Sequence, residues 1–131
     1  MYGQMPEKPE LMVFKVFDLD SSALNGKATR KQVRITFDEK IDSVYMDILI
    51  YIPNHINKPS PLILSLNFAG NQELLADENI AITQSWVAKK AFGSVNHQAT
   101  AVSRGVAEAT FPIEKMIDNG FATATIYCGD I

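Results

Sequence analysis

Residues 61–71 read PLILSLNFAGN, and this stretch decides the fold class. From Leu62 to Phe68 the residues are almost continuously apolar, the pattern of a parallel strand buried on both faces of a sheet. Ala69-Gly70-Asn71 ends the run abruptly. A second short run of small and apolar residues, Phe121 to Tyr127, also has the length of a strand.

The segment between these two runs predicts how they are connected. Residues 69–110 show no convincing period, and a loop that long inside a compact domain is unusual and tends to be functional. Order returns at Phe111-Pro112, because proline suits the first turn of a helix and the apolar residues between 113 and 117 have helical spacing. Asn119-Gly120 predicts the helix end. We therefore expect a right-handed βαβ crossover with parallel strands.

Two alternating runs upstream predict an antiparallel hairpin, Thr29 to Phe37 and Val44 to Ile52, joined by polar residues 38–42. In the first run the apolar face has Val33, Ile35 and Phe37, and the polar face has Gln32, Arg34 and Thr36. In the second run Val44, Met46, Ile48, Ile50 and Ile52 oppose Tyr45, Leu49 and Tyr51, so both faces are expected to be partly covered. A further strand is predicted from Leu11 to Phe17, with a turn signal at Asn25-Gly26. A hairpin feeding a parallel βαβ unit is an α/β sheet with an antiparallel edge.

The composition excludes several classes of protein. Lys and Arg number 12 against 15 Asp and Glu, so no basic excess exists to attract nucleic acid or an anionic membrane surface. No run approaches the roughly 18 apolar residues of a membrane helix. The start, MYGQMPEKPEL, lacks the basic and apolar regions of a secretory signal. The single cysteine, Cys128, excludes a disulfide scaffold, and its apolar neighbours favour a buried, inert thiol.

Candidate site residues follow the two predicted parallel strands, where open α/β sheets bind ligands. They lie in residues 67–71 and 129–131. Gly70 permits close backbone approach, which would leave amide N–H groups to face an anion or an oxyanion. The alternative is a strand-ending turn in which Asn67 and Asn71 hydrogen-bond their own backbone. Asp130 is likewise either a site carboxylate or a turn cap.

The catalytic candidates are weaker. Ser103 lies in AVSRG, which differs from the Gly-x-Ser-x-Gly nucleophile elbow by alanine in place of the first glycine. No strand precedes it, so we expect it in a loop. His55 lies in a proline-rich loop, where we expect a solvated side chain. His97 lies in the long loop and could approach the site, but no candidate nucleophile lies beside it. Two separate histidines and one cysteine make no metal cluster, so we expect neither a metal nor a cofactor. Asp77-Glu78 is interpreted as a solvated pair.

Trp86 is the only tryptophan. It either anchors the long loop by packing or lines a site for a sugar or an aromatic ligand.

Several segments, in order and spacing, resemble the bacterial glucuronoyl esterases and the related acetylxylan-esterase-like proteins of the α/β-hydrolase fold. These are NGKATR (25–30), LSLNFAGN (64–71), SWV (85–87), SRG (103–105), FPIE (111–114) and GFATATIYCGDI (120–131). The resemblance runs from about residue 24 to the end, and the first 20 residues match poorly.

The resemblance implies a serine hydrolase that cleaves glucuronoyl or acetyl esters of a plant polysaccharide such as xylan. In that family the nucleophile follows the next core strand and the histidine and acid come later, so the triad is expected beyond residue 131 and this chain is expected to be inactive alone. The oxyanion and substrate pocket would be bordered by Asn67, Phe68, Gly70, Asn71 and Asp130. Members are commonly secreted or periplasmic. The alternative is a non-catalytic α/β module that binds carbohydrate or protein.

The family's strand order, 1-2-4-3-5, implies a bare edge. The Leu62 to Phe68 strand would normally pair with a fifth strand, so residues 1–131 are expected to form a single partial domain, with residues 69–110 at the site face. An apolar, unpaired edge favours aggregation. We therefore expect the remainder of the hydrolase domain to be needed to cover it.

Overall fold

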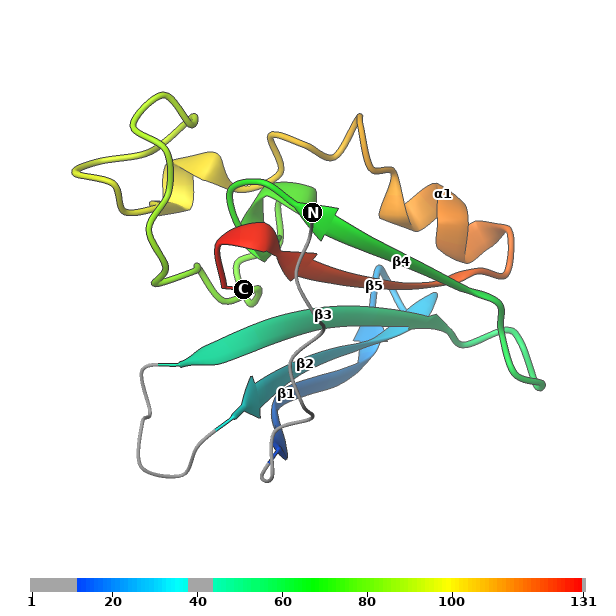
Figure 1. Ribbon diagram of the computed structural model, residues 1–131. Helices are drawn as coiled ribbons and strands as arrows, with labels where there is room; N and C mark the ends of the chain where they lie inside the picture. Colours follow the sequence, from blue (N-terminus) through cyan, green and yellow to red (C-terminus); the bar gives the residue numbers. More distant parts are fainter. Residues whose placement is uncertain (1–11, 38–43, 131) are drawn as a thin grey trace, which may run out of the picture.

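The computed structural model describes residues 12–37 and 44–130. The strands are β1 (Val13–Ala23), β2 (Ala28–Thr36), β3 (Tyr45–Pro53), β4 (Leu62–Asn67) and β5 (Ala122–Tyr127), with one α-helix, α1 (Ile113–Asp118). Three single-turn 3-10 helices complete the order: η1 (Asn71–Leu74), η2 (Ala101–Ser103) and η3 (Cys128–Asp130). Figure 1 shows the sheet with α1 and the long loop on one side of it.

The strands form one mixed sheet in the order β1-β2-β3-β5-β4. β1, β2 and β3 are successively antiparallel, β3 and β5 are antiparallel, and β5 and β4 are parallel. The predicted hairpin and the predicted parallel pair joined through a helix are both confirmed, and so is the α/β class. β4 lies at the edge of the sheet, where the predicted strand order places it.

The first strand is longer than predicted. β1 continues past Phe17 to Ala23, with irregularities in its pairing between Val16 and Asp18 and between Asp20 and Ala23. The Asp18 carboxylate accepts a 2.9 Å hydrogen bond from Nε of Arg30 on β2, which holds this polar stretch in the sheet. The predicted turn is confirmed at residues 24–27, where Asn25 and Gly26 have φ of 57° and 84°. The predicted strand start at Leu11 and the polar connector lie outside the described residues.

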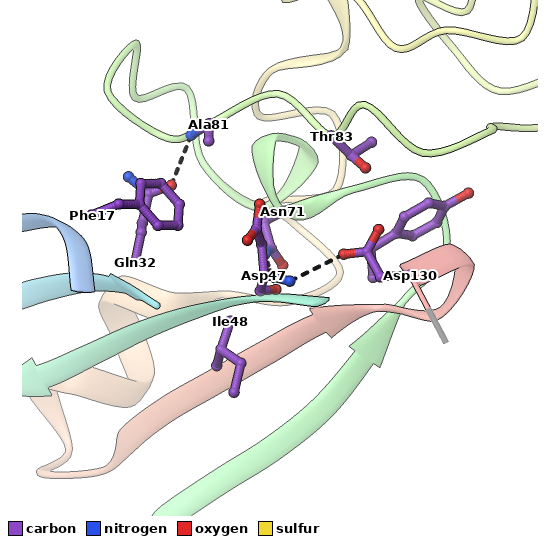
Figure 2. Close-up of a pocket in the computed structure, with 9 residues that line it drawn as sticks. Phe17, Gln32, Asp47, Ile48, Asn71, Ala81, Thr83 and Asp130 are labelled. Atoms are coloured by element: carbon purple, nitrogen blue, oxygen red, sulfur yellow. Dashed lines mark hydrogen bonds between the residues drawn. The ribbon is translucent and has the colours of Figure 1, made fainter. Parts of the chain in front are cut away.

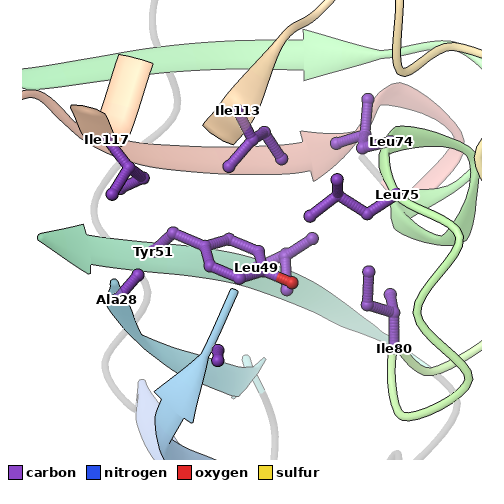
Figure 3. Close-up of a cluster of buried hydrophobic side chains, with 9 residues drawn as sticks. Ala28, Leu49, Tyr51, Leu74, Leu75, Ile80, Ile113 and Ile117 are labelled. Atoms are coloured by element: carbon purple, nitrogen blue, oxygen red, sulfur yellow. The ribbon is translucent and has the colours of Figure 1, made fainter. Parts of the chain in front are cut away.

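One face of the sheet, the covered face, packs against α1 and the long loop. Its residues on β3 are Leu49 and Tyr51, which pair with Thr125 and Thr123 of β5. Figure 3 shows Ile113 and Ile117 of α1 above Tyr51 and Leu49. The buried cluster consists of Ala23, Ala28, Leu49, Tyr51, Leu74, Leu75, Ile80, Ile113 and Ile117.

The opposite face, the open face, carries Leu62, Leu64 and Leu66 of β4, which pair with Ala122, Ala124 and Ile126. The three leucines are 57%, 66% and 51% exposed. The prediction of a strand buried on both faces is therefore wrong for this structure, because α1 and the long loop pack on the covered face only. On β2 the predicted faces hold only in part: Ile35 of the apolar face is buried, but so is Gln32 of the polar face, whereas Val33 is only half-buried.

Residues 69–110 contain no helix longer than the single turns η1 and η2, as their lack of periodicity predicts. α1 is confirmed where Pro112 and Gly120 bracket it, and Gly120 has the positive φ of 82° that suits the residue after a helix. Within residues 12–37 and 44–130, the only α-helix is far too short to cross a membrane.

Candidate functional site

The turn after β4 is closed by its own side chains. The Asn67 amide donates to Oδ1 of Asn71 at 2.7 Å, and the Gly70 N–H donates to Oδ1 of Asn67 at 2.9 Å. Thr125 of β5 donates to the same Asn71 oxygen at 3.1 Å. Gly70 has φ 113°, and a Cβ there would clash with the Gln72 side chain, so glycine is required. The asparagines therefore serve the turn itself, and the Gly70 N–H is already bonded.

Asp130 ties three segments together at the carboxyl end of β5. Its Oδ1 accepts a 2.5 Å hydrogen bond from the Ser85 hydroxyl, and its Oδ2 accepts the Asp47 N–H at 3.3 Å. The Asn71 amide donates to the Asp47 carbonyl at 3.0 Å. Asn71 and Asp130 thus meet at one point of β3 and line a small pocket together with Phe17 and Gln32 (Figure 2).

The pocket's Asp47 carboxylate is not free. Nε and an Nη of Arg34 donate to its two oxygens at 2.8 and 2.7 Å. This bidentate hydrogen bonding raises the pKa of Arg34, and burial opposes the effect. Within this pocket the Asp47 carboxylate is thus paired with Arg34, and the Asp130 carboxylate is held by the Ser85 hydroxyl and the Asp47 N–H.

Phe68 lies apart from that network. Its side chain is 82% exposed at the end of β4. With Asn67 and Leu66 it lines an apolar groove, whose other wall includes Leu74 and Phe111. The structure thus divides the predicted site residues: Asn67 and Phe68 line the groove, Asn71 and Asp130 line the polar pocket, and buried Gly70 lies between them.

Ser103 has a structural place in the loop, as expected. It is buried; its hydroxyl donates to the Thr100 carbonyl at 2.8 Å and accepts from the Gln72 amide at 3.1 Å. His97 stacks on Trp86 and hydrogen-bonds Val87, so the structure does not bring it to Ser103 as a base. His55 is exposed in its loop. No group of three or more metal-ligating side chains occurs in the described part of the chain.

Two interpretations need correction, and the prediction of a buried Cys128 holds only in part. Asp77 is not simply solvated, because its carboxylate pairs with the buried Arg30 guanidinium; Glu78 is exposed. Trp86 is 61% exposed, so it is not a packed anchor. Cys128, expected to be buried, is half-buried.

Sequence reasoning missed the buried polar centre beneath the long loop. Arg30 is 2% exposed and pairs with Asp18 and Asp77, and Gln32 bonds the backbone of residues 79 and 81. Burial acts to lower the pKa of Arg30, but the hydrogen bond and the charges of Asp18 and Asp77 raise it above the ordinary value. Alternation marked Gln32 as solvent-facing, and no local signal distinguishes a polar residue under a loop from one in water.

Comparisons with known proteins agree on one family. The chain is 45% identical over 132 residues to the carbohydrate esterase MZ0003 of an unknown prokaryotic organism. Among solved structures, it superposes with a TM-score of 0.88 and 44% identity on a promiscuous CE15 esterase from a marine bacterial metagenome. A glucuronoyl esterase from Solibacter usitatus gives a TM-score of 0.85 with 33% identity.

These matches take in nearly all of this chain and a minority of each relative. They cover 100%, 99% and 99% of the chain but 30%, 32% and 32% of the respective relatives. No family model matches the chain. The sheet order, the turn after β4 and these likenesses agree: the chain resembles the amino-terminal part of the bacterial glucuronoyl esterases, within the α/β-hydrolase fold.

Proposed function

We propose that this chain forms the amino-terminal part of a serine carbohydrate esterase that acts on glucuronoyl or acetyl esters of a plant polysaccharide such as xylan. In such a reaction a serine oxygen attacks the ester carbonyl, the alcohol leaves as an acyl-serine forms, and water then releases the acid. The likeness to carbohydrate and glucuronoyl esterases supports the reaction class. We place the serine, its histidine and its acid in residues beyond 131.

The observation that carries the proposal is the exposed apolar surface of β4. Leu62, Leu64 and Leu66 project from an edge strand that is parallel to its neighbour. Parallel strands of α/β proteins are normally covered on both faces, and edge strands this apolar are normally paired. A further strand beside β4 and helices over the open face would satisfy both requirements, and they would bring the nucleophile to the carboxyl end of β4.

The turn after β4 then has a defined role. In α/β hydrolases one oxyanion N–H comes from the loop after the equivalent strand. Because the Gly70 N–H already donates to Asn67, we assign this role to the backbone just before it, at Phe68 and Ala69. The exposed Phe68 ring forms a wall of the substrate pocket. Asn67 and Asn71 fix the shape of the turn, and Asp130 joins them through Asp47.

Reconstitution tests the proposal. The chain is mixed or co-expressed with the part of the carbohydrate esterase MZ0003 that it does not match, and hydrolysis of an aryl acetate and of a benzyl ester of glucuronic acid is measured. We expect no turnover from the chain alone and turnover from the pair. Turnover by the chain alone that Ser103→Ala abolishes and Val102→Ala leaves intact would overturn the proposal. Association without turnover would favour the non-catalytic binding module.

A further inference from the structure

An exposed aromatic stack lies near the carboxyl ends of the parallel strands. Trp86 is 61% exposed, and its ring stacks on His97 with centroids 5.0 Å apart and planes 16° apart. Tryptophan is highly buried on average, so a ring left at the surface is informative. Because His97 takes one face of the indole, the exposed area lies on the opposite face and along the ring edge.

The backbone beneath Trp86 is tied to the end of β5. The Tyr127 hydroxyl donates to the Trp86 carbonyl at 2.7 Å, and the neighbouring Ser85 hydroxyl donates to Asp130 at 2.5 Å. Ligands of open α/β sheets bind at the carboxyl ends of the strands. Both ties thus hold the indole beside the region where the proposed ester chemistry takes place.

His97 is held just as firmly. The Val87 N–H donates to the His97 carbonyl at 3.0 Å, and Nδ1 of His97 donates to the Val87 carbonyl at 3.1 Å. Val87 itself is 1% exposed. The His97 ring and the backbone of Trp86 are therefore held before any ligand arrives, and the indole stacks on the held imidazole. A platform supported in this way loses little conformational freedom on binding.

The backbone of the turn that carries His97 is strained. Val95 and Gln98 exchange backbone hydrogen bonds of 2.9 and 3.0 Å, and the two residues between them, Asn96 and His97, have φ of 50° and 64°. Two-residue turns with positive φ at both positions strongly favour Asn-Gly. His97 occupies the glycine position. A side chain kept in a conformation that disfavours it points to a use for that side chain, and here the imidazole supports Trp86.

We infer that Trp86, backed by His97, is a stacking subsite for a pyranose ring of the polysaccharide chain. The inference rests on the proposed function for the identity of the ligand. A pyranose presents C–H groups on its faces and hydroxyls around its rim, so it stacks on a flat aromatic face while its rim stays in water. An exposed indole with its backbone fixed offers such a face, with a large contact area and few rotatable bonds to order.

The test uses a neutral xylo-oligosaccharide and the 131-residue chain, at a concentration at which light scattering shows a monomer. Because Trp86 is the only tryptophan, its fluorescence reports directly on contact with the sugar. We expect a saturable fluorescence change, and retardation of the chain in native gels that contain soluble xylan. Trp86→Ala should abolish the retardation. Phe92→Ala, which removes another exposed ring of the same loop, 62% exposed, should leave it unchanged.

His97→Gly separates binding from folding. Glycine relieves the strained turn, so the unfolding midpoint should stay the same or rise, while the sugar affinity should fall about fivefold as the indole loses its support. No saturable response in the unmodified chain, or full retardation of Trp86→Ala, would overturn the inference. A fall in the His97→Gly midpoint with unchanged affinity would also overturn it, since it would show a purely structural stack. The probe is not an ester, so retardation that persists where reconstitution yields no esterase would count against the proposed function alone.

Discussion

The two faces of the sheet differ in which residues they bury and which they expose. On the covered face, Arg30, Gln32, Thr123 and Thr125 are buried beside Leu49 and Tyr51. On the open face, Leu62, Leu64 and Leu66 of β4 are more than half exposed, as are Phe14 and Val16 of β1. Large apolar side chains exposed side by side, as along β4, mark an interaction site in soluble proteins. The open edge at β4 thus has the composition of an interior, and the covered face is an interior built around a polar centre.

The largest expected effect distinguishes two leucines of the sheet. Leu49→Ala on the covered face should lower the free energy of unfolding by about 3 kcal/mol, because it leaves a cavity under α1 and the loop. Leu64→Ala on the open face should cost less than about 0.5 kcal/mol, because the side chain is mostly in solvent. Urea titrations followed by circular dichroism, made at a concentration at which light scattering shows a monomer, measure both. Equal losses for the two variants would show that the open face is packed in solution.

The polar centre gives the next largest effect. Arg30→Met should lower the free energy of unfolding by about 2 kcal/mol, because it leaves the Asp18 and Asp77 carboxylates without their shared partner. The two aspartate side chains are about a quarter exposed, which keeps the loss below that of a fully buried pair. Arg34→Met, which breaks the more exposed pair with Asp47, should cost less than about 1 kcal/mol. The comparison is measured by the same titrations, and a larger loss for Arg34→Met would contradict the assigned role of the centre.

The same centre predicts a pH dependence. Burial acts to raise the pKa of Asp18, but hydrogen bonds from Arg30 and Gln32 hold it below the ordinary value. A carboxylate whose pKa is lower in the folded state stabilises the fold above its unfolded pKa, and this contribution is lost as the pH falls through the folded pKa. The unfolding midpoint should therefore fall on acidification below about pH 4. Asp18→Asn should flatten that dependence, and an unchanged slope would exclude Asp18 as its source.

The smallest effect concerns an ion pair at the surface. Lys27 bonds Glu114 at 2.7 Å and Asp118 at 3.1 Å on α1, but all three groups are exposed. Solvent screens such pairs, so Lys27→Ala should leave the urea midpoint unchanged within error. A clear loss of stability would show that α1 depends on its charged end as well as on Ile113 and Ile117.

The sequence predicts the elements of this fold better than their surroundings. Alternation located β2 and β3, the apolar run located β4, and Pro112 with Gly120 bracketed α1, because each of these signals depends on neighbours along the chain. The burial of Gln32 on β2 could not be predicted, since its partners lie in the backbone of residues 79 and 81. The predicted burial of β4 on both faces failed for the same reason, because burial depends on what packs against a strand.

The candidate site shows the same division. The sequence placed Asn67 to Asn71 and Asp130 at the carboxyl ends of the strands, and the structure brings Asn71 and Asp130 to one point of β3. The sequence could not show that the Gly70 N–H is bonded to Asn67, or that Trp86 stacks on His97, because both contacts depend on loop geometry. The strained backbone of His97 has no signal in residue type alone.

The central claim is that the open face is built to be covered. Light scattering, combined with heating and cooling scans of the unmodified chain, tests it most directly. We expect the chain to self-associate and to melt irreversibly, and we expect a variant with Leu62→Lys, Leu64→Lys and Leu66→Lys to be monomeric with the same circular dichroism. A monodisperse monomer with a sharp, reversible transition for the unmodified chain would contradict the account.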